Sequence, residues 1–522
     1  LQHKGKTAAN AATLSSVPLH NFYGYEIDPT SSMIAEVAMW LTEHQLNMRL
    51  ESEFGQAPPT IPLKEAAHIK NCNALQTNWQ TDIENTYFDY ILGNPPFVGT
   101  AYQTSTQKKN LYELFHENKS AGMLDFVTAW FIKAAIYIQN RNTKAAFVCT
   151  NSIVQGEQNG ILWGELFHKF KIKINFAHQT FKWSNEAKGN AAVHVAIIGF
   201  SYVEVKKKII YSYEQINGEP TENAVIKINS YLVEASEVIL KSINTPICKV
   251  PKMQSGSASR DGGFLIFSEE EKNELVKLYP ESVVFFKRFI SGDDFINSKT
   301  RWCLWLKEYS PDKFRHIKEI AKRLNEVKNF REKSTRIGTR KMADLPYLFA
   351  EERQPKNDFL LIPKVSSENR KYIPIAYLTN DFIVTDKTFI IPNTDLFHFG
   401  ILTSIMHMAW VKYTCGRLES RFSYSNTIVY NNYPWPESPS PAQVAAIEAA
   451  AQKVLDVRAQ YPNASLADLY DPLTMPQPLQ KAHTELDKAV DTAYRPQAFA
   501  TEAKRLEYLF ELYEKKIEEL KN

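Results

Sequence analysis

An apolar run at residues 87–93 ends directly at Asn94-Pro95-Pro96-Phe97, and this junction restricts the fold more than any other feature of the chain. The run, Tyr87-Phe88-Asp89-Tyr90-Ile91-Leu92-Gly93, predicts a buried strand. Two prolines fix the backbone that follows, so a rigid turn is expected at the C-terminal end of the strand. Open α/β sheets bind their ligands at that end. The turn therefore marks a candidate active site.

The side chains of this turn suit one kind of chemistry. The Asn94 amide and the Pro95 carbonyl can accept both hydrogens of an exocyclic amino group. The Phe97 ring offers a face on which a base can stack. Accepting both hydrogens favours a more nucleophilic nitrogen and holds it in line with an incoming methyl group, without a strong base. We take methyl transfer to a nucleobase amine as the first hypothesis, and a proline-rich loop without chemical meaning as its alternative.

Strands and helices alternate around the turn up to about residue 200. Residues 22–28 predict a strand ending in two acids, and the helix after it is expected to run from Pro29 to about Asn47. A further helix is predicted over residues 126–138, and further strands over residues 145–150, 172–177 and 192–200. This order predicts a mostly parallel, doubly wound, Rossmann-like α/β sheet. The last two strands lack a clear helix between them, which favours an antiparallel hairpin at the sheet edge.

Four polar residues near strand ends are candidates for binding a cofactor. An acid after the second strand of such a sheet commonly binds a ribose, and we assign this role to Glu26. Asp28 is well placed as the N-cap of the helix that follows. Asn73 either hydrogen-bonds an adenine ring of the cofactor or forms a turn. Asp125 either contacts the cofactor or caps the next helix, and the cap is the better single interpretation.

Aromatic side chains also occur on a polar segment, Phe181-Lys182-Trp183-Ser184-Asn185. Phe181 or Trp183 could form the second face of a base sandwich opposite Phe97. The alternative is that these rings anchor the loop to the sheet.

Beyond about Tyr202 the alternation ends. Strand-like pieces predict a separate α+β domain, and they lie at residues 359–363, 382–386, 389–391 and 427–430. A proline-rich boundary at residues 433–441 precedes a helical segment, with an amphipathic helix near residues 502–520.

Two polar segments of the second domain are candidates for contact with nucleic acid. Residues 312–341 carry eleven Lys/Arg against four Asp/Glu, a local net charge of +7. Apolar residues at helical spacing predict that this run has a buried face: Phe314, Ile317, Ile320, Leu324 and Val327. Its tail, expected not to be helical, offers Arg336, Arg340 and Lys341 to DNA. The loop bearing Ser366, Glu368 and Arg370 has side chains suited to base edges, with an ordinary solvated turn as the alternative.

Composition narrows the class of protein. The net charge of +3 makes any nucleic-acid surface a local patch. The five cysteines are scattered and form neither a zinc pattern nor a disulfide framework, which favours the cytoplasm. No apolar stretch reaches the roughly 18 residues of a membrane span.

Longer strings of residues give the chain a more specific resemblance. The Asn-Pro-Pro-Phe turn matches the catalytic motif of amino-group DNA methyltransferases, in which a leading Asn points to adenine. The order of ribose acid, turn and downstream recognition domain resembles the gamma arrangement. The chain looks like the C-terminal portion of the MmeI-like (type IIL/IIG) restriction–modification enzymes. The strings that carry this resemblance are residues 150–158, 177–186, 301–306 and 424–432.

This resemblance implies S-adenosylmethionine as cofactor and a flipped adenine in double-stranded DNA as substrate. It implies a partial methyltransferase domain at 1–205, a target-recognition domain at 206–436 and a helical C-terminal domain at 437–522. Carried over by position, Asn94 and Phe97 hold the adenine, and Glu26 and Asn73 hold the cofactor.

The chain departs from the family pattern in one respect. No Gly-rich turn of the kind that lets the backbone approach the cofactor precedes Tyr25. We therefore expect an N-terminally truncated sheet that binds S-adenosylmethionine weakly by itself, with a nuclease domain further upstream in the longer protein. Two alternatives stay open: a DNA-recognition module without catalysis, and methylation of the cytosine N4 amine or of RNA.

Overall fold

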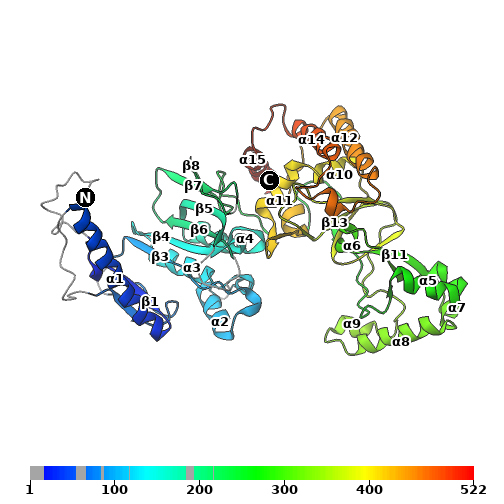
Figure 1. Ribbon diagram of the computed structural model, residues 1–522, viewed down its shortest axis with the longest axis horizontal. Helices are drawn as coiled ribbons and strands as arrows, with labels where there is room; N and C mark the ends of the chain where they lie inside the picture. The colour runs from blue at the N-terminus through cyan, green and yellow to red at the C-terminus, as the bar shows by residue number, and fades with distance from the viewer. Residues whose placement is uncertain are drawn as a thin grey trace.

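The strand–helix alternation builds a central sheet in the computed structural model, which describes residues 17–54, 66–83, 87–116, 118–183, 193–215 and 217–521 (Figure 1). The strands follow one another across the sheet as β3 (Tyr90–Gly93), β4 (Lys144–Thr150), β6 (Val193–Ser201), β5 (Lys173–Trp183), β7 (Lys208–Ser212) and β8 (Thr221–Val225). β3 is parallel to β4 and β5 to β7, whereas β6 is antiparallel to both of its neighbours. The expected α/β sheet is therefore present, with mixed strand directions.

The expected hairpin of consecutive strands is the antiparallel pair β5–β6. Its place at the sheet edge was predicted wrongly, because β7 pairs with β5 on the other side and β8 pairs with β7. β7 and β8 lie beyond residue 205, where the first domain was expected to end, and they still belong to this sheet.

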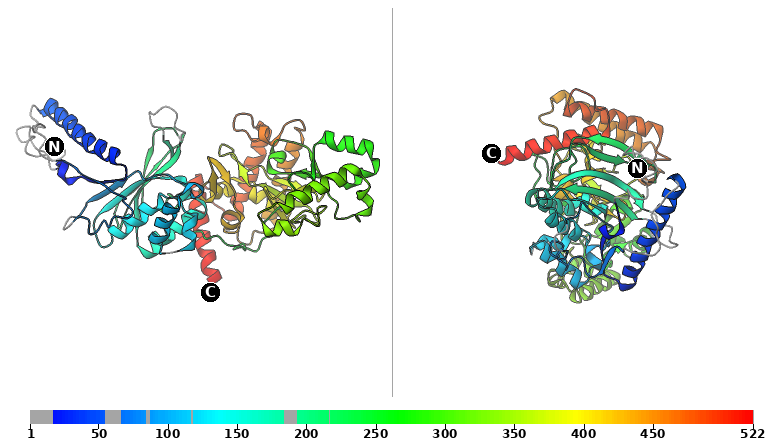
Figure 2. Two further views of the ribbon diagram at one scale, coloured as in Figure 1. Left: turned by 90° about the horizontal axis from the view of Figure 1, so that it is seen from below. Right: turned by 90° about the vertical axis from the view of Figure 1, so that its left-hand side faces the viewer.

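A second, two-stranded sheet carries the predicted first strand. β1 (Tyr23–Glu26) pairs in parallel with β2 (His68–Asn71), and α1 (Pro29–Phe54) connects them. α1 starts at the predicted residue and extends past the predicted end. It lies with β1 at one end of the elongated molecule, beyond β3 (Figures 1 and 2). Within the described residues β1 pairs only with β2, and β3 only with β4, so each strand has one unpaired edge.

Aromatic residues fix two helices against the central sheet. α3 (Thr128–Tyr137) places Phe131 5.3 Å from Phe147 of β4 and 5.4 Å from Phe200 of β6, measured between ring centroids. α4 (Gly156–Gly164) adds Trp163, 6.2 Å from Phe131. α2 (Ser105–Leu114) follows the Pro-Pro turn and begins with a capping box at Thr104. The turn is thus attached to a packed core.

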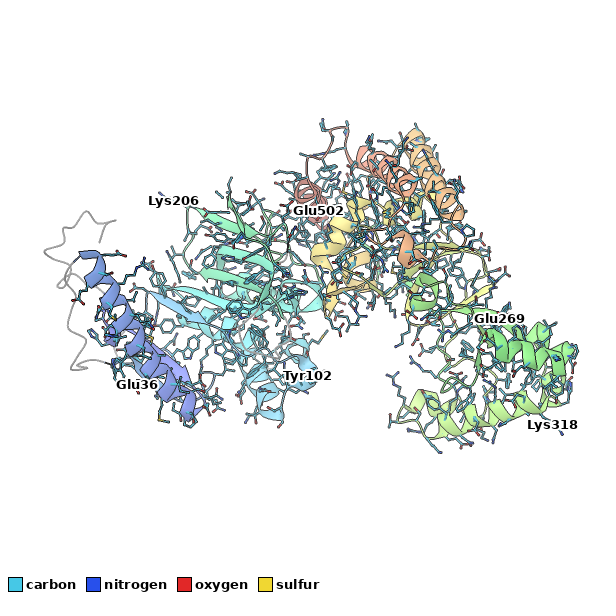
Figure 3. All side chains as sticks on the ribbon, viewed as in Figure 1. Glu36, Tyr102, Lys206, Glu269, Lys318 and Glu502 are labelled. Atoms are coloured by element: carbon cyan, nitrogen blue, oxygen red, sulfur yellow. The ribbon has the colours of Figure 1, made fainter. Side chains whose placement is uncertain are left out.

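The second domain contains three small sheets and several helices. One sheet is ordered β10 (Ile266–Phe267), β12 (Arg301–Leu304), β11 (Phe286–Ile290) and β16 (Phe382–Val384). The next is β15 (Ala376–Leu378), β13 (Phe359–Pro363), β17 (Thr388–Pro392) and β9 (Gln254–Ser255), and the third is β14 (Val365–Ser366), β19 (Arg421–Ser423) and β18 (Gly416–Leu418). The helices are α5 (Glu269–Leu278), α6 (Gly292–Ile296), α7 (Asp312–Arg315), α8 (Lys318–Glu332) and α9 (Ile337–Lys341). Glu269 and Lys318 mark the starts of α5 and α8 at the far end of this domain (Figure 3).

Two local predictions in this domain were wrong. The tail of the basic run was expected not to be helical, yet residues 337–341 form α9. Residues 427–430 were expected to form a strand, but they lie in the helical turn Asn426–Tyr430. Ser425 explains the second case, because its hydroxyl accepts the Ile428 N–H and so caps this turn.

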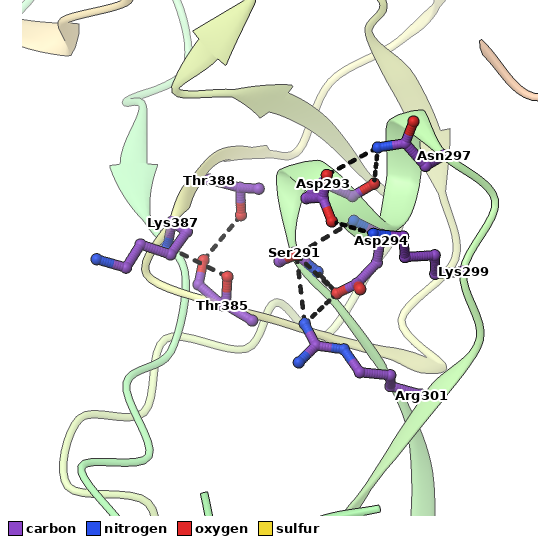
Figure 4. A network of polar contacts seen from close by, with 9 residues as sticks. All are labelled: Ser291, Asp293, Asp294, Asn297, Lys299, Arg301, Thr385, Lys387 and Thr388. Atoms are coloured by element: carbon purple, nitrogen blue, oxygen red, sulfur yellow. Dashed lines mark hydrogen bonds and ion pairs between the residues drawn. The ribbon is translucent and has the colours of Figure 1, made fainter. Parts of the chain in front are cut away.

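A polar network joins α6 to β12 (Figure 4). Arg301 forms an ion pair with Asp294, and the Ser291 N–H donates to the same carboxylate at 2.8 Å. Burial raises the pKa of Asp294, but the hydrogen bonds from Arg301 and Ser291 outweigh it and leave the pKa below its usual value. Arg301, which begins one of the family-like strings, therefore has a structural role.

The C-terminal helices share one hydrophobic core with the second domain. They are α12 (Pro441–Ala459), α13 (Leu466–Leu469), α14 (Gln477–Tyr494) and α15 (Glu502–Lys521), and they pack around α10 (Leu396–Leu402) and α11 (Ile405–Thr414). Asp487 of α14 accepts hydrogen bonds from Tyr372 and from the Ile405 N–H. None of the helices in the described part of the chain has an apolar stretch of the length that a membrane span requires.

Candidate active site

A cavity of about 790 Å³ lies between the facing strands β1 and β3. Glu26 at the end of β1, Asn73 after β2 and Asn94 after β3 all line it. The fold thus brings three of the predicted site residues together at the carboxyl ends of parallel strands.

The Pro-Pro turn presents its asparagine and buries its first proline. Asn94 is exposed and Pro95 is buried, so the Asn94 amide is accessible from the cavity. Gly93 allows the strand to approach Phe147, because a β-carbon at Gly93 would lie 3.1 Å from the Phe147 ring. Phe97 packs against the hydrophobic core of the sheet and does not line this cavity.

Glu26 and Asp28 make different hydrogen bonds: the cap predicted for Asp28 is confirmed, and ribose binding by Glu26 stays a prediction. The Asp28 carboxylate accepts the Ser31 N–H at 2.7 Å and caps α1. These hydrogen bonds from Ser31 lower the pKa of Asp28. One Glu26 oxygen, Oε1, accepts the Asp28 N–H at 3.0 Å. Its second oxygen has no hydrogen-bond partner within the described part of the chain, so it can accept from a ligand.

Asn73 forms a turn and keeps its amide nitrogen available. Its Oδ1 accepts the Leu75 N–H at 3.0 Å, and its backbone carbonyl accepts the Thr77 N–H at 3.0 Å. The side-chain nitrogen has no hydrogen-bond partner among the described residues. Both interpretations of Asn73, a turn residue and a cofactor contact, are compatible with this geometry.

Asp125 does not cap a helix, so that interpretation was wrong. α3 begins at Thr128, and Val127 stands at its N-cap without a side-chain hydrogen bond. The Asp125 carboxylate instead accepts hydrogen bonds from Thr150 and Gln158, each at 3.1 Å. Asp125 is buried and does not line the cavity, although its neighbour Phe126 does.

Aromatic residues that the sequence analysis did not assign complete the cavity wall. Trp79, Phe126 and Trp130 line it, and Phe126 and Trp130 meet edge to face with centroids 5.2 Å apart. Phe126 and Trp130 lie four positions apart, the spacing of one helix face. This spacing in the sequence could have indicated that both rings face the cavity, but it equally fits a helix packed in a core.

Phe181 and Trp183 lie at the end of β5. The Phe181 ring stacks on Tyr213, with centroids 5.1 Å apart, and Trp183 is 39% exposed. Neither residue lines the cavity that contains Asn94. Ser184, Asn185 and Glu186 of the same string lie outside the described residues.

A second cavity, of about 490 Å³, lies between the central sheet and the second domain. His194 lines it from the sheet, and Glu368 and Arg417 line it from the second domain. Burial raises the pKa of Glu368, but hydrogen bonding to Ser420 and the Arg417 charge outweigh it and lower the pKa overall. Burial also lowers the pKa of His194. An ionised carboxylate therefore faces this cavity at neutral pH.

The other two predicted residues of the Glu368 loop are placed differently. Ser366 is buried, and its hydroxyl has no hydrogen-bond partner within the described segments. Arg370 is half-buried and does not line the second cavity.

The basic run divides into structural and exposed cations. The apolar residues at helical spacing are buried as predicted. Arg331 is also fully buried, and its guanidinium donates to five backbone carbonyls, those of Ser259, Arg260, Met342, Leu345 and Leu348. Arg336, Arg340 and Lys341 are exposed, and Arg340 donates to the Ser334 carbonyl at 2.6 Å.

Three family models match consecutive parts of the chain. They are "MmeI, DNA-methyltransferase domain" at residues 2–212, "MmeI, target recognition domain" at residues 234–437, and "MmeI, C-terminal domain" at residues 439–521. Together they cover the same three-part order that the sequence predicted.

Two known proteins are similar over nearly the whole chain. The curated relative "DNA methyltransferase A" of Bacillus subtilis (strain 168) is 40% identical over 508 residues, which are 96% of this chain and 57% of the relative. The solved type IIL restriction–modification enzyme MmeI in complex with DNA is 46% identical, with a TM-score of 0.84. That match covers 97% of this chain and 67% of the MmeI chain. The chain thus spans little more than half of the curated relative.

Proposed function

The chain belongs to the MmeI family, and we propose that it transfers a methyl group from S-adenosylmethionine to the N6 amine of an adenine flipped out of duplex DNA. The observation that carries this proposal is the cavity in which Asn94, Glu26 and Asn73 meet. A leading Asn in the Pro-Pro turn favours adenine over cytosine by its resemblance to the adenine methyltransferases.

The residues around the cavity fit the proposed cofactor. Its volume of about 790 Å³ falls within the usual range for binding sites of small ligands. The available oxygen of Glu26 suits a ribose diol, and the Asn73 amide nitrogen suits a ring nitrogen of adenine. Trp79 and Trp130 add apolar surface to the wall. S-adenosylmethionine supplies an electrophilic methyl group when bound.

The turn would prepare the amine that receives this group. Asn94 Oδ1 and the Pro95 carbonyl oxygen hold the two amino hydrogens, which directs the nitrogen lone pair out of the plane of the base. Both acceptors are neutral, so the chain activates the amine by orientation and needs no strong base.

The second domain would position the DNA. The solved relative was determined in complex with DNA. In this chain, the exposed cations Arg336, Arg340 and Lys341 suit phosphate contacts, and Glu368 in the cavity between the domains suits a base edge. DNA cleavage by the longer protein stays a prediction from the family resemblance.

Replacing Asn94 by Ala tests the proposal. With protein expressed from the complete coding region, we expect methyl transfer to fall by at least about a hundredfold while DNA affinity stays within about twofold. Mass analysis of nucleosides from treated DNA should show N6-methyladenine. Asn273→Ala, on the exposed surface of α5, is the matched control. Activity that survives in Asn94→Ala contradicts the assignment, and N4-methylcytosine or a methylated RNA product supports the corresponding alternative.

The alternative of a recognition module without catalysis rests on β1 and β3, each of which has a strand partner on one side only among the described residues. Both strands border the cavity, and Leu92 of β3 is 77% exposed although it is apolar. An incompletely covered wall predicts weak cofactor binding by this chain alone. Calorimetric titration of the 522-residue chain is expected to show no micromolar binding of S-adenosylmethionine, and micromolar binding would refute this alternative.

A further inference from the structure

Side chains at the start of α4 form hydrogen bonds with three separate parts of the molecule. Gln155 contacts the second domain, Gln158 contacts Asp125 in the first, and Asn159 exchanges hydrogen bonds with Ser230 in the segment that connects them. Gln155 and Gln158 belong to the string at residues 150–158, which the proposed chemistry leaves without a role.

Gln158 holds Asp125 in a paired geometry. Its Oε1 accepts the Asp125 backbone N–H at 2.8 Å, and its Nε2 donates to Asp125 Oδ1 at 3.1 Å. Thr150 donates to the other carboxylate oxygen, Oδ2, at 3.1 Å. Because the backbone N–H can only donate, it fixes which end of the Gln158 amide faces which atom.

Asp125 lies directly behind the catalytic turn. The N–H of its neighbour Phe126 donates to the Val98 carbonyl at 2.9 Å, and a β-carbon at Gly99 would lie 3.8 Å from Asp125 Oδ1. Phe126 itself lines the cavity that contains Asn94. A shift of Asp125 would therefore move both the segment after the turn and one wall of the cavity.

The same helix is attached to the second domain at its N-terminus. Arg417 of β18 donates to Gln155 Oε1 at 3.1 Å. Gly156 has a φ of +60° and lies so close to Gly416 that a β-carbon at Gly156 would be 3.1 Å from the Gly416 Cα. A side chain at Gly156 would therefore strain the backbone at this residue and push the two domains apart.

We propose that Gln158 is a positioning residue. We also propose that a change in the position of the second domain moves the Asn94 segment through the contacts of Gln155–Gln158. Gln158 acts through Asp125, and Gln155 acts through Arg417. The effects on kcat that follow from this inference rest on the proposed methyl transfer. The effect on the position of Asp125 and Phe126 can be measured without activity.

Exchange of the two partners tests the pair. Gln158→Glu alone places one carboxylate against another. Asp125→Asn alone can keep its oxygen on the Gln158 amide nitrogen and donate its own nitrogen to the Thr150 hydroxyl, so it is expected to preserve the pair. In the double variant, the new carboxylate at position 158 accepts both the backbone N–H and the new side-chain amide of position 125. The amide oxygen at position 125 accepts from Thr150, so all three hydrogen bonds are restored. The total charge of the pair also stays the same.

Gln158→Glu alone is expected to lower kcat for methyl transfer by about tenfold or more, because two carboxylates then face each other beside the site. Asp125→Asn alone should change kcat by less than about threefold, because it keeps the hydrogen bonds of the pair. KM for DNA should change by less than about threefold, because neither residue is at the DNA surface. The double variant should recover most of kcat. A double variant that is as impaired as Gln158→Glu would overturn the assignment, as would Gln158→Glu without any loss.

Hydrogen exchange supplies the readout that does not depend on activity. In Gln158→Glu, the Phe126 amide should exchange at least about tenfold faster, and the double variant should restore its protection. If the protection of the Phe126 amide is the same in Gln158→Glu and in the parent protein, Gln158 has no positioning role, whether or not methyl transfer is detected. If the double variant restores this protection but the parent protein transfers no methyl group, only the proposed function is contradicted.

The link to the second domain is tested by Gln155→Ala, with Asn273→Ala on the exposed surface of α5 as control. We expect Gln155→Ala to speed exchange at Phe126 and to lower kcat on the recognised sequence, and we expect no change in the control. If Gln155→Ala matches the parent protein in both measurements, the proposal that α4 couples the second domain to the Asn94 segment is wrong.

Discussion

The rings of Phe181 and Tyr213 stack with centroids 5.1 Å apart and planes 21° apart. A neighbouring pair, His178 and Tyr211, stacks at 4.2 Å, and His178 Nδ1 is 2.8 Å from the Tyr213 hydroxyl. Burial lowers the pKa of His178, so its ring is neutral at pH 7. Tyr213 thus packs against one face of the Phe181 ring.

This arrangement predicts that Phe181, rather than Trp183, stacks on the flipped base. Phe181→Ala should lower kcat/KM for methyl transfer by about tenfold or more, because base–aromatic stacking contributes roughly 1–3 kcal/mol. Trp183→Ala should have a smaller effect. DNA with 2-aminopurine at the target position reports stacking by fluorescence, and Tyr213→Phe serves as a control that keeps the supporting ring. A larger loss in Trp183→Ala would contradict the assignment.

Glu26→Gln is expected to weaken cofactor binding about tenfold, because a hydrogen bond to a charged acceptor contributes roughly 1.5–3 kcal/mol. Calorimetric titration of S-adenosylmethionine into protein from the complete coding region measures the change. Asp28→Asn is the matched control, since it alters the cap of α1 and leaves the Glu26 carboxylate in place. Equal losses in both variants would show that the loop geometry, and not the Glu26 carboxylate, determines binding.

Arg336→Ala and Lys341→Ala are expected to weaken binding of all DNA sequences alike. Each lost phosphate contact should reduce the slope of log affinity against log salt concentration by about 0.9. Lys318→Ala, at the opposite end of α8 from α9, is the control (Figure 3). Fluorescence anisotropy over a series of salt concentrations gives the slopes. An unchanged slope in both variants would place the phosphate contacts elsewhere.

The sequence predicted those features that local patterns determine. The cap at Asp28 and the helical spacing around Ile320 each depend on residues close in the chain. The apolar run before Asn94 forms a strand, but only over Tyr90–Gly93, and its predicted burial was wrong, since Leu92 is 77% exposed. Residues 94–97 follow β3 directly, as predicted, but their backbone is irregular and forms no turn.

Features that depend on distant partners were missed. Asp125 was interpreted as a cap because its partner Gln158 lies 33 residues away. Arg331 was counted as part of a basic surface, although carbonyls from two other segments enclose it. The β-branched residues at 427–429 suggested a strand, but Asn432 donates to the Thr427 and Ile428 carbonyls and supports a helical turn.

His407 provides a pH-dependent test of the core shared by the second domain and the C-terminal helices. It is fully buried, with Nδ1 2.8 Å from the Leu402 carbonyl and Nε2 3.0 Å from the Tyr424 hydroxyl. A carbonyl can only accept, so Nδ1 carries the proton and Nε2 accepts from Tyr424. Burial lowers the pKa of His407 to about 4, from 6.5 in an unfolded chain.

The unfolded state therefore binds an extra proton between pH 6.5 and pH 4, and the native state does not. Stability from His407 is complete above about pH 6.5, and it should decline by roughly 3 kcal/mol as the pH falls to about 4. Hydrogen exchange of the α11 amides at about pH 7, 6 and 5, corrected for intrinsic rates, measures the local free energy of opening. His407→Gln cannot gain this proton, so its opening free energy should fall less steeply with decreasing pH. An identical pH dependence in His407→Gln and the parent protein would mean that protonation of His407 is not coupled to opening of this core.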